Sequence, residues 1–126
     1  MMTRVFLTIA ALLGGSAVGL GAFGTHALKE QFSERSLEIF ETAVRYQMYH
    51  ALALLLVGVL ISRSTTEQPF LTVSGSAFLV GTLLFCGSLY ALSFSGIKWL
   101  GAVAPLGGLA LMVGWVSIAI AAWSYK

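Results

Sequence analysis

The stretch ALALLLVGVLI, residues 51–61, consists of aliphatic residues and one glycine and contains no polar or charged side chain. It lies in a longer interval, between Arg45 and Arg63, of 17 residues without Asp, Glu, Lys or Arg. A helix needs about 20 apolar residues to cross the hydrocarbon core of a bilayer, with about 17 as the lower limit. A strand of a membrane barrel would instead alternate polar and apolar residues. The stretch therefore predicts a membrane-spanning helix.

The same pattern recurs on both sides of this stretch. Three further intervals without charged residues, 5–28, 68–97 and 99–125, contain 24, 30 and 27 residues. Hydrophobic residues make up 58% of the chain and charged residues 10%, with a mean hydropathy of +0.91. A soluble domain carries about 25% charged residues. We therefore expect an all-α membrane protein with four transmembrane helices in a compact bundle, the spans lying near residues 5–23, 44–61, 70–92 and 99–123.

The connections between these spans are short, so residues 1–126 are expected to form a single membrane domain. The link SRSTTEQP, residues 62–69, ends in Pro69, which suits the first turn of the next helix.

Four spans place both termini on one side, and Arg4 beside the first span slightly favours the cytoplasmic side. The net charge of +2 forms no Lys/Arg stripe, so no nucleic-acid partner is expected. The predicted location is the bacterial cytoplasmic (inner) membrane, as a multi-pass integral protein.

An amphipathic helix that runs into span two is predicted between spans one and two, over about residues 33–45. Ser33 suits its N-cap, and the glutamates that follow suit a helix N-terminus. On a helical wheel Glu34, Glu38, Glu41 and Arg45 share one stripe. Glu41 and Arg45 are spaced for an (i, i+4) ion pair. Two interpretations stay open: a solvated face of a helix at the membrane surface, or a face that docks a partner or cation.

The glycine-rich stretch GGSAVGLGAFGTHALKE, residues 14–30, allows three interpretations. The pattern G-x-G-x-x-G at 19–24 binds nucleotides only between a strand and a helix, and here it ends an apolar run. A basic start followed by apolar and small residues also resembles a signal peptide, and whether the first span is cleaved stays open. The third interpretation is a close helix contact, because Gly15 and Gly19 have the small-xxx-small spacing. Gly108 in the last span is a further helix-packing candidate.

Polar residues of three spans are expected at one membrane side. His26, Gln47, His50 and Tyr90 form the candidate polar cluster, because spans alternate in direction and these residues lie near the same ends. A polar group inside a membrane is costly unless it is paired. Helix capping or hydrogen bonding between helices, handling of a proton or ligand, and metal binding are the alternatives. Two histidines rarely complete a metal site. We therefore predict no catalytic residue, no metal site and no cofactor.

Three motifs resemble one family. The stretches GLGAFGTHAL (19–28), FETAVRYQMYHALALL (40–55) and GAVAPLGGLALMVGW (101–115) are similar to those of the small membrane proteins grouped as domain-of-unknown-function 423. The similarity covers essentially the whole chain. It implies an integral membrane protein of four helices with a retained first span, and it implies no assigned reaction and no known catalytic residues.

Three classes of function follow from these observations. The first expectation is a non-enzymatic accessory or assembly partner, with the lipid bilayer around it and a membrane protein or further copies of the chain as partner. The second is a pathway for a small molecule or ion, although the span centres carry none of the charges usual on such a route. The third is an enzyme that acts on a lipid or quinone. The sequence favours a protein that is not an enzyme.

Overall fold

The chain folds entirely into helices. The computed structural model describes residues 1–126. The predicted first span lies within the continuous helical segment Met2–Leu28, and each of the other three lies within one long helix to within one residue. Each long helix is long and apolar enough to cross a membrane, which confirms the all-α class with four spans. The elements are α1 (Met2–Gly19), a π-helical turn η1 (Leu20–Gly24), α2 (Thr25–Leu28), α3 (Glu34–Arg63), α4 (Pro69–Ser95) and α5 (Leu100–Ser124).

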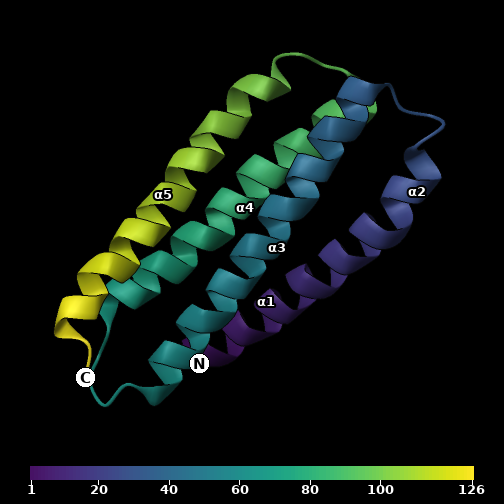
Figure 1. The fold of residues 1–126 in the computed structure, drawn as a ribbon. Helices are drawn as coiled ribbons and strands as arrows, with labels where there is room; N and C mark the ends of the chain where they lie inside the picture. Colours follow the sequence, from purple (N-terminus) through teal and green to yellow (C-terminus); the bar gives the residue numbers. More distant parts are fainter.

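The four long helices run antiparallel and pack in the order of the sequence. The main contacts join α1 to α3, α3 to α4 and α4 to α5, so α1 and α5 lie at the two ends of the row (Figure 1). Both termini lie at the same end of the molecule (Figure 1). The predicted bundle is therefore packed together, with α3 and α4 in its middle and two outer helices that each leave a long face uncovered.

The predicted amphipathic helix is the first part of α3. The Ser33 side chain caps α3 by accepting a hydrogen bond from the Ser36 amide at 3.1 Å, as predicted. The helix then runs without a break to Arg63, because residues 34–57 contain neither Gly nor Pro. Residues 33–45 are thus collinear with the second span and do not form a separate helix on the membrane surface.

The predicted ion pair between Glu41 and Arg45 is absent. Arg45 binds the Thr42 hydroxyl instead, at 3.4 Å. Along this part of α3 the only ion pair joins Arg35 to Glu38, also at 3.4 Å. The side chains lie on one face as the wheel predicted, but Arg45 turns toward Thr42, three residues before it.

The glycine motif of residues 19–24 lies inside a helix, which excludes the strand-to-helix turn of a nucleotide-binding loop. Its central part is the π-helical turn η1, where the Thr25 amide reaches back five residues to the Leu20 carbonyl. On this turn Gly21 and Gly24 face α3: a Cβ at Gly21 would lie 3.1 Å from the Val44 side chain. The wider turn and the missing side chains let the end of the first span lie close against α3.

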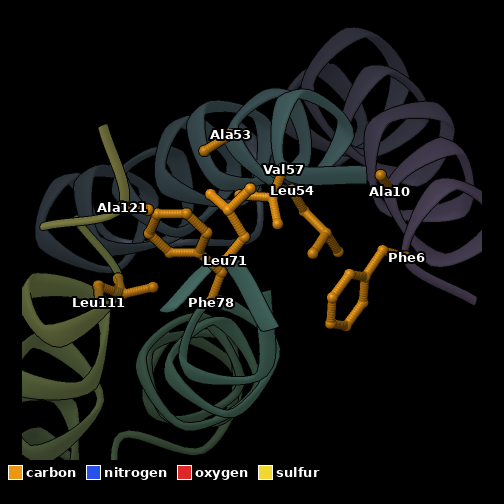
Figure 2. Close-up of a cluster of buried hydrophobic side chains, with 9 residues drawn as sticks. All are labelled: Phe6, Ala10, Ala53, Leu54, Val57, Leu71, Phe78, Leu111 and Ala121. Carbon is orange, nitrogen blue, oxygen red and sulfur yellow. The ribbon is translucent and has the colours of Figure 1, made fainter. Parts of the chain in front are cut away.

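The apolar core runs through the middle of the row. Nine buried side chains from all four long helices form it (Figure 2): Phe6, Ala10, Ala53, Leu54, Val57, Leu71, Phe78, Leu111 and Ala121. The ring of Phe6 reaches past α3 to pack over Gly75 of α4. The ring of Phe78 packs in the same way over Gly114 of α5. Glycine at these two positions makes room for an aromatic ring from a neighbouring helix.

Candidate functional site

Gln47 joins three helices through hydrogen bonds. Its side chain is buried on α3, and its amide nitrogen donates to the Leu13 carbonyl at 2.8 Å and to the Ser16 hydroxyl at 2.7 Å, both on α1. Its carbonyl oxygen accepts from the Tyr90 hydroxyl of α4 at 2.7 Å. Both donors and the acceptor of the amide are therefore used within the chain. The arrangement links α1, α3 and α4 at one depth.

His50 makes a second cross-link, from α3 to α5. Its Nε2 atom lies 3.1 Å from the indole nitrogen of Trp115, and its Nδ1 atom lies 2.8 Å from the Tyr46 carbonyl. An indole N–H can only donate, so Nε2 accepts and the proton lies on Nδ1, which donates to the carbonyl. The contacts thus fix a neutral imidazole with both nitrogens engaged. His50 holds α5 in place and has no free nitrogen for a proton or a metal.

The structure divides the predicted polar cluster. Gln47 and Tyr90 are directly hydrogen-bonded, and His50 lies one helical turn from Gln47 with a partner of its own. His26 is exposed on α2 and its side chain makes no hydrogen bond, so it is not part of this hydrogen-bonded cluster.

Sequence reasoning missed the partners of these groups. Ser16 and the Leu13 carbonyl complete the Gln47 contacts, and Trp115 completes those of His50. A signal for Trp115 was available, because an indole N–H far from the ends of an apolar span needs an acceptor, and His50 is one of few candidates. Nothing in the sequence indicates which backbone carbonyl a buried amide binds.

Within the chain, the close helix contacts lie at other small residues than Gly15, Gly19 and Gly108. A Cβ at Gly15 or Gly19 would meet no atom within 4 Å, so neither glycine faces another helix of the same chain. Ala10 and Ala17 are the buried small residues of α1, which places the packed face about one residue away from the predicted one. At Gly108 the nearest atom to a Cβ is in the Phe85 ring, at 3.9 Å, an ordinary contact. The close approach between α4 and α5 occurs at Gly107, against the Phe85 backbone.

Two hollows adjoin these cross-links. An apolar cleft of about 570 Å³ lies between α3, α4 and α5, with the His50–Trp115 pair, Tyr46, Phe85, Gly108 and Met112 in its wall. A second, charged groove of about 380 Å³ is lined by Arg35, Glu38, Glu41, Thr42 and Arg45 of α3 and by Phe85 and Leu89 of α4. Phe85 borders both hollows, so they are neighbours on one side of the molecule.

The chain is similar to several bacterial membrane proteins. A family model described as "Protein of unknown function (DUF423)" matches residues 20–108. The UPF0382 membrane protein YwdK of Bacillus subtilis is 41% identical over 97% of this chain and 98% of its own length. UPF0382 membrane proteins of Staphylococcus aureus and Haemophilus influenzae are 39% and 37% identical, over 97% and 99% of this chain and 98% of their own lengths. No solved structure matches the chain. Together with its four spans, these relatives show a multi-pass integral membrane protein.

Proposed function

The chain belongs to the DUF423 family of proteins of unknown function, and within this family we propose that it is a non-enzymatic accessory protein of the membrane. In this role it assembles with another transmembrane helix, supplied by a partner protein or by a further copy of the chain. The proposal rests on the outer face of α1 and on the way the buried polar groups are used.

The outer face of α1 is the observation that carries the proposal. Ala11 and Gly15 are exposed there, Ala22 is exposed on the adjoining turn η1, and no atom lies within 4 Å of a Cβ built at Gly15 or Gly19. The first span is also the least buried of the four. In its most apolar stretch 17% of the residues are buried, against 39% for the span of α3. A long, smooth strip of small residues is therefore open to the membrane.

Glycine on a lipid-facing surface has a cost. A glycine inside a helix is about 1 kcal/mol less favourable than alanine, and lipid gains nothing from the missing side chain. Small residues at four-residue spacing allow the backbones of two transmembrane helices to approach closely, and van der Waals contact then stabilises the pair. Because no helix of the chain uses this strip, a helix from outside the chain is the partner that gives it a role.

The buried polar groups support the same proposal. Gln47 and His50 use all their hydrogen-bonding atoms on other parts of the chain. Each such bond between membrane helices contributes about 0.6 kcal/mol, and up to about 1.7 kcal/mol. They fix the relative positions of the helices, as a rigid packing unit requires.

The test is a substitution that blocks the strip without disturbing the fold. In Gly15→Leu the new side chain meets open space within the chain, so the purified variant is expected to unfold at the same temperature as the wild type. The leucine side chain at position 15 is expected to keep a second helix from packing closely against α1. Multi-angle light scattering in mild detergent, together with mass spectrometry of co-purified proteins, measures the assembly.

Gly87→Leu is the matched control, because Gly87 also meets open space but lies on α4. Loss of a self-assembled species in Gly15→Leu alone identifies a further copy as partner. Loss of a stoichiometric co-purified protein in Gly15→Leu alone identifies another protein. A wild type that is monomeric and without a partner, or equal assembly of both variants, contradicts the proposal.

A further inference from the structure

The apolar cleft and the charged groove form one amphipathic surface. Both hollows are bordered by Phe85, and the ring of Tyr46 packs against Phe85 at a centroid distance of 4.7 Å. Arg45, in the groove, directly precedes Tyr46, in the cleft. No residue of α1 lines either hollow, so this surface is separate from the strip of small residues on that helix.

The depth of this surface in the membrane follows from the sequence of α3. Arg45 is the last charged residue before 17 residues without charge. The groove therefore lies at the level where lipid headgroups begin, and the cleft lies below it, among the acyl chains. A cationic side chain at such a boundary reaches toward the headgroups.

The cleft has the size and lining of a site for a hydrocarbon chain. Its volume of about 570 Å³ lies within the range of about 300–1,000 Å³ typical of small-molecule sites. Leu109 and Met112 are exposed at its edge, so it opens toward the membrane. The His50 and Trp115 side chains in its wall are hydrogen-bonded to each other, which leaves mainly apolar surface for contact.

The groove offers one free charge of each sign. The Arg45 guanidinium has no carboxylate partner and contacts only the Thr42 hydroxyl. The Glu41 carboxylate forms no ion pair, whereas Arg35 and Glu38 neutralise each other at 3.4 Å. A guanidinium is a strong ligand for phosphate, and a carboxylate for an ammonium group that can donate hydrogen bonds. The charges of the groove are thus complementary to a headgroup that carries both.

We propose that this surface holds one phospholipid whose headgroup carries a phosphate and a primary ammonium group. Its phosphate binds Arg45, its ammonium binds Glu41, and one acyl chain lies in the cleft beside Trp115. The ligand class is a zwitterionic aminophospholipid such as phosphatidylethanolamine. This inference does not depend on the assembly proposed for α1.

The test is lipid retention measured by native mass spectrometry. The protein is reconstituted into vesicles with equal amounts of phosphatidylethanolamine, phosphatidylglycerol and phosphatidylcholine, and then extracted in mild detergent. The wild type is expected to retain one phosphatidylethanolamine, in about fivefold excess over phosphatidylglycerol, the factor of one interfacial charge. A similar excess of about fivefold is expected over phosphatidylcholine, the factor of one net hydrogen bond. Phosphatidylglycerol lacks the ammonium group, and the quaternary ammonium of phosphatidylcholine has no N–H to donate.

Two charge variants separate the roles of the groove. Arg45→Gln is expected to lower the retention of all three lipids, since all carry a phosphate. Glu41→Gln is expected to keep a bound lipid but to lose the preference for phosphatidylethanolamine over phosphatidylglycerol. Arg63→Gln and Glu67→Gln, at the opposite membrane end, are the matched controls and are expected to behave as the wild type.

A third variant tests the cleft. Gly108→Leu places a side chain in the cleft and is expected to lower lipid retention, whereas Gly87→Leu, in open space on α4, leaves it unchanged. Equal retention of the three lipids by the wild type overturns the proposal. So does an unchanged preference in Glu41→Gln, or a loss in Arg63→Gln as large as that in Arg45→Gln.

Discussion

Single residues in this protein show how a membrane helix uses a polar side chain. Gln47 and His50 lie in or beside an apolar run. Gln47 is fully hydrogen-bonded to neighbouring helices, and His50 is hydrogen-bonded to Trp115 of α5 and to the Tyr46 carbonyl of its own helix. In lipid an unpaired donor or acceptor is costly because no water replaces the lost partner. The sequence indicated that these residues need partners, but the partners, Ser16 and Trp115, depend on the rotation of each helix.

The hydrogen bond between His50 and Trp115 can be tested with a double-mutant cycle. His50→Leu is expected to lose about 1–2 kcal/mol of stability, because it leaves the indole N–H without an acceptor. In His50→Gln the amide oxygen can accept from the indole, so most of that stability is retained. The measurement is reversible unfolding in mixed detergent micelles.

The control for this cycle is Trp115→Phe, which removes the donor. In the combined His50→Leu and Trp115→Phe variant the loss is expected to be smaller than the sum of the two single losses. Strictly additive losses would show that the two side chains do not stabilise each other.

At the scale of the elements, sequence and structure agree on the helices and differ on which faces meet. The lengths of the charge-free intervals predicted all four spans, and Pro69 and Ser33 predicted two helix starts, which the structure confirms. The face of α1 that packs against α3 could not be predicted, because several small residues follow one another there. Residues 10, 14 and 17 form as good a strip as residues 11, 15 and 19. Which strip contacts α3 depends on the side chains of α3, which a pattern in α1 does not contain.

Close packing of α4 against α5 gives a prediction at this scale. A Cβ at Gly107 would lie 2.8 Å from the Cα of Phe85, so Gly107→Ala forces the two backbones apart. We expect a loss of about 1–3 kcal/mol, as is usual for overpacking. Gly87→Ala, on the open side of α4, is expected to be neutral or slightly stabilising. Equal unfolding temperatures of the two variants in a detergent melt would contradict the packing of this pair.

At the scale of the whole molecule, four antiparallel helices form a row whose outer faces are open to the membrane. Its two sides differ. The outer face of α1 presents small residues, and the side formed by α3, α4 and α5 presents a cleft below a charged groove. Each outer helix of such a row packs mainly against one neighbour in the chain, so both keep a long face open to their surroundings.

The topology of the row predicts which connections share a membrane side. Cys86→Ser removes the single native cysteine, and new cysteines are then introduced one at a time. Cysteines in place of Thr3 and Ser124 are expected to react with a membrane-impermeant maleimide from one side, and a cysteine at Gly96 from the other. Reaction of the Thr3 and Ser124 positions from opposite sides would exclude four spans.

The assembly of α1 with an outside helix is the central claim, and a photo-cross-linking scan of this helix in intact membranes tests it most directly. A photoreactive phenylalanine derivative is placed at single positions from Ala10 to Ala22. Adducts are expected at Ala11, Gly15, Gly19 and Ala22, which recur with the period of a helix, and at neither Ala10 nor Ala17. All adducts are expected to contain one partner of constant mass. Adducts at none of these positions, or spread over them without period, would contradict the claim.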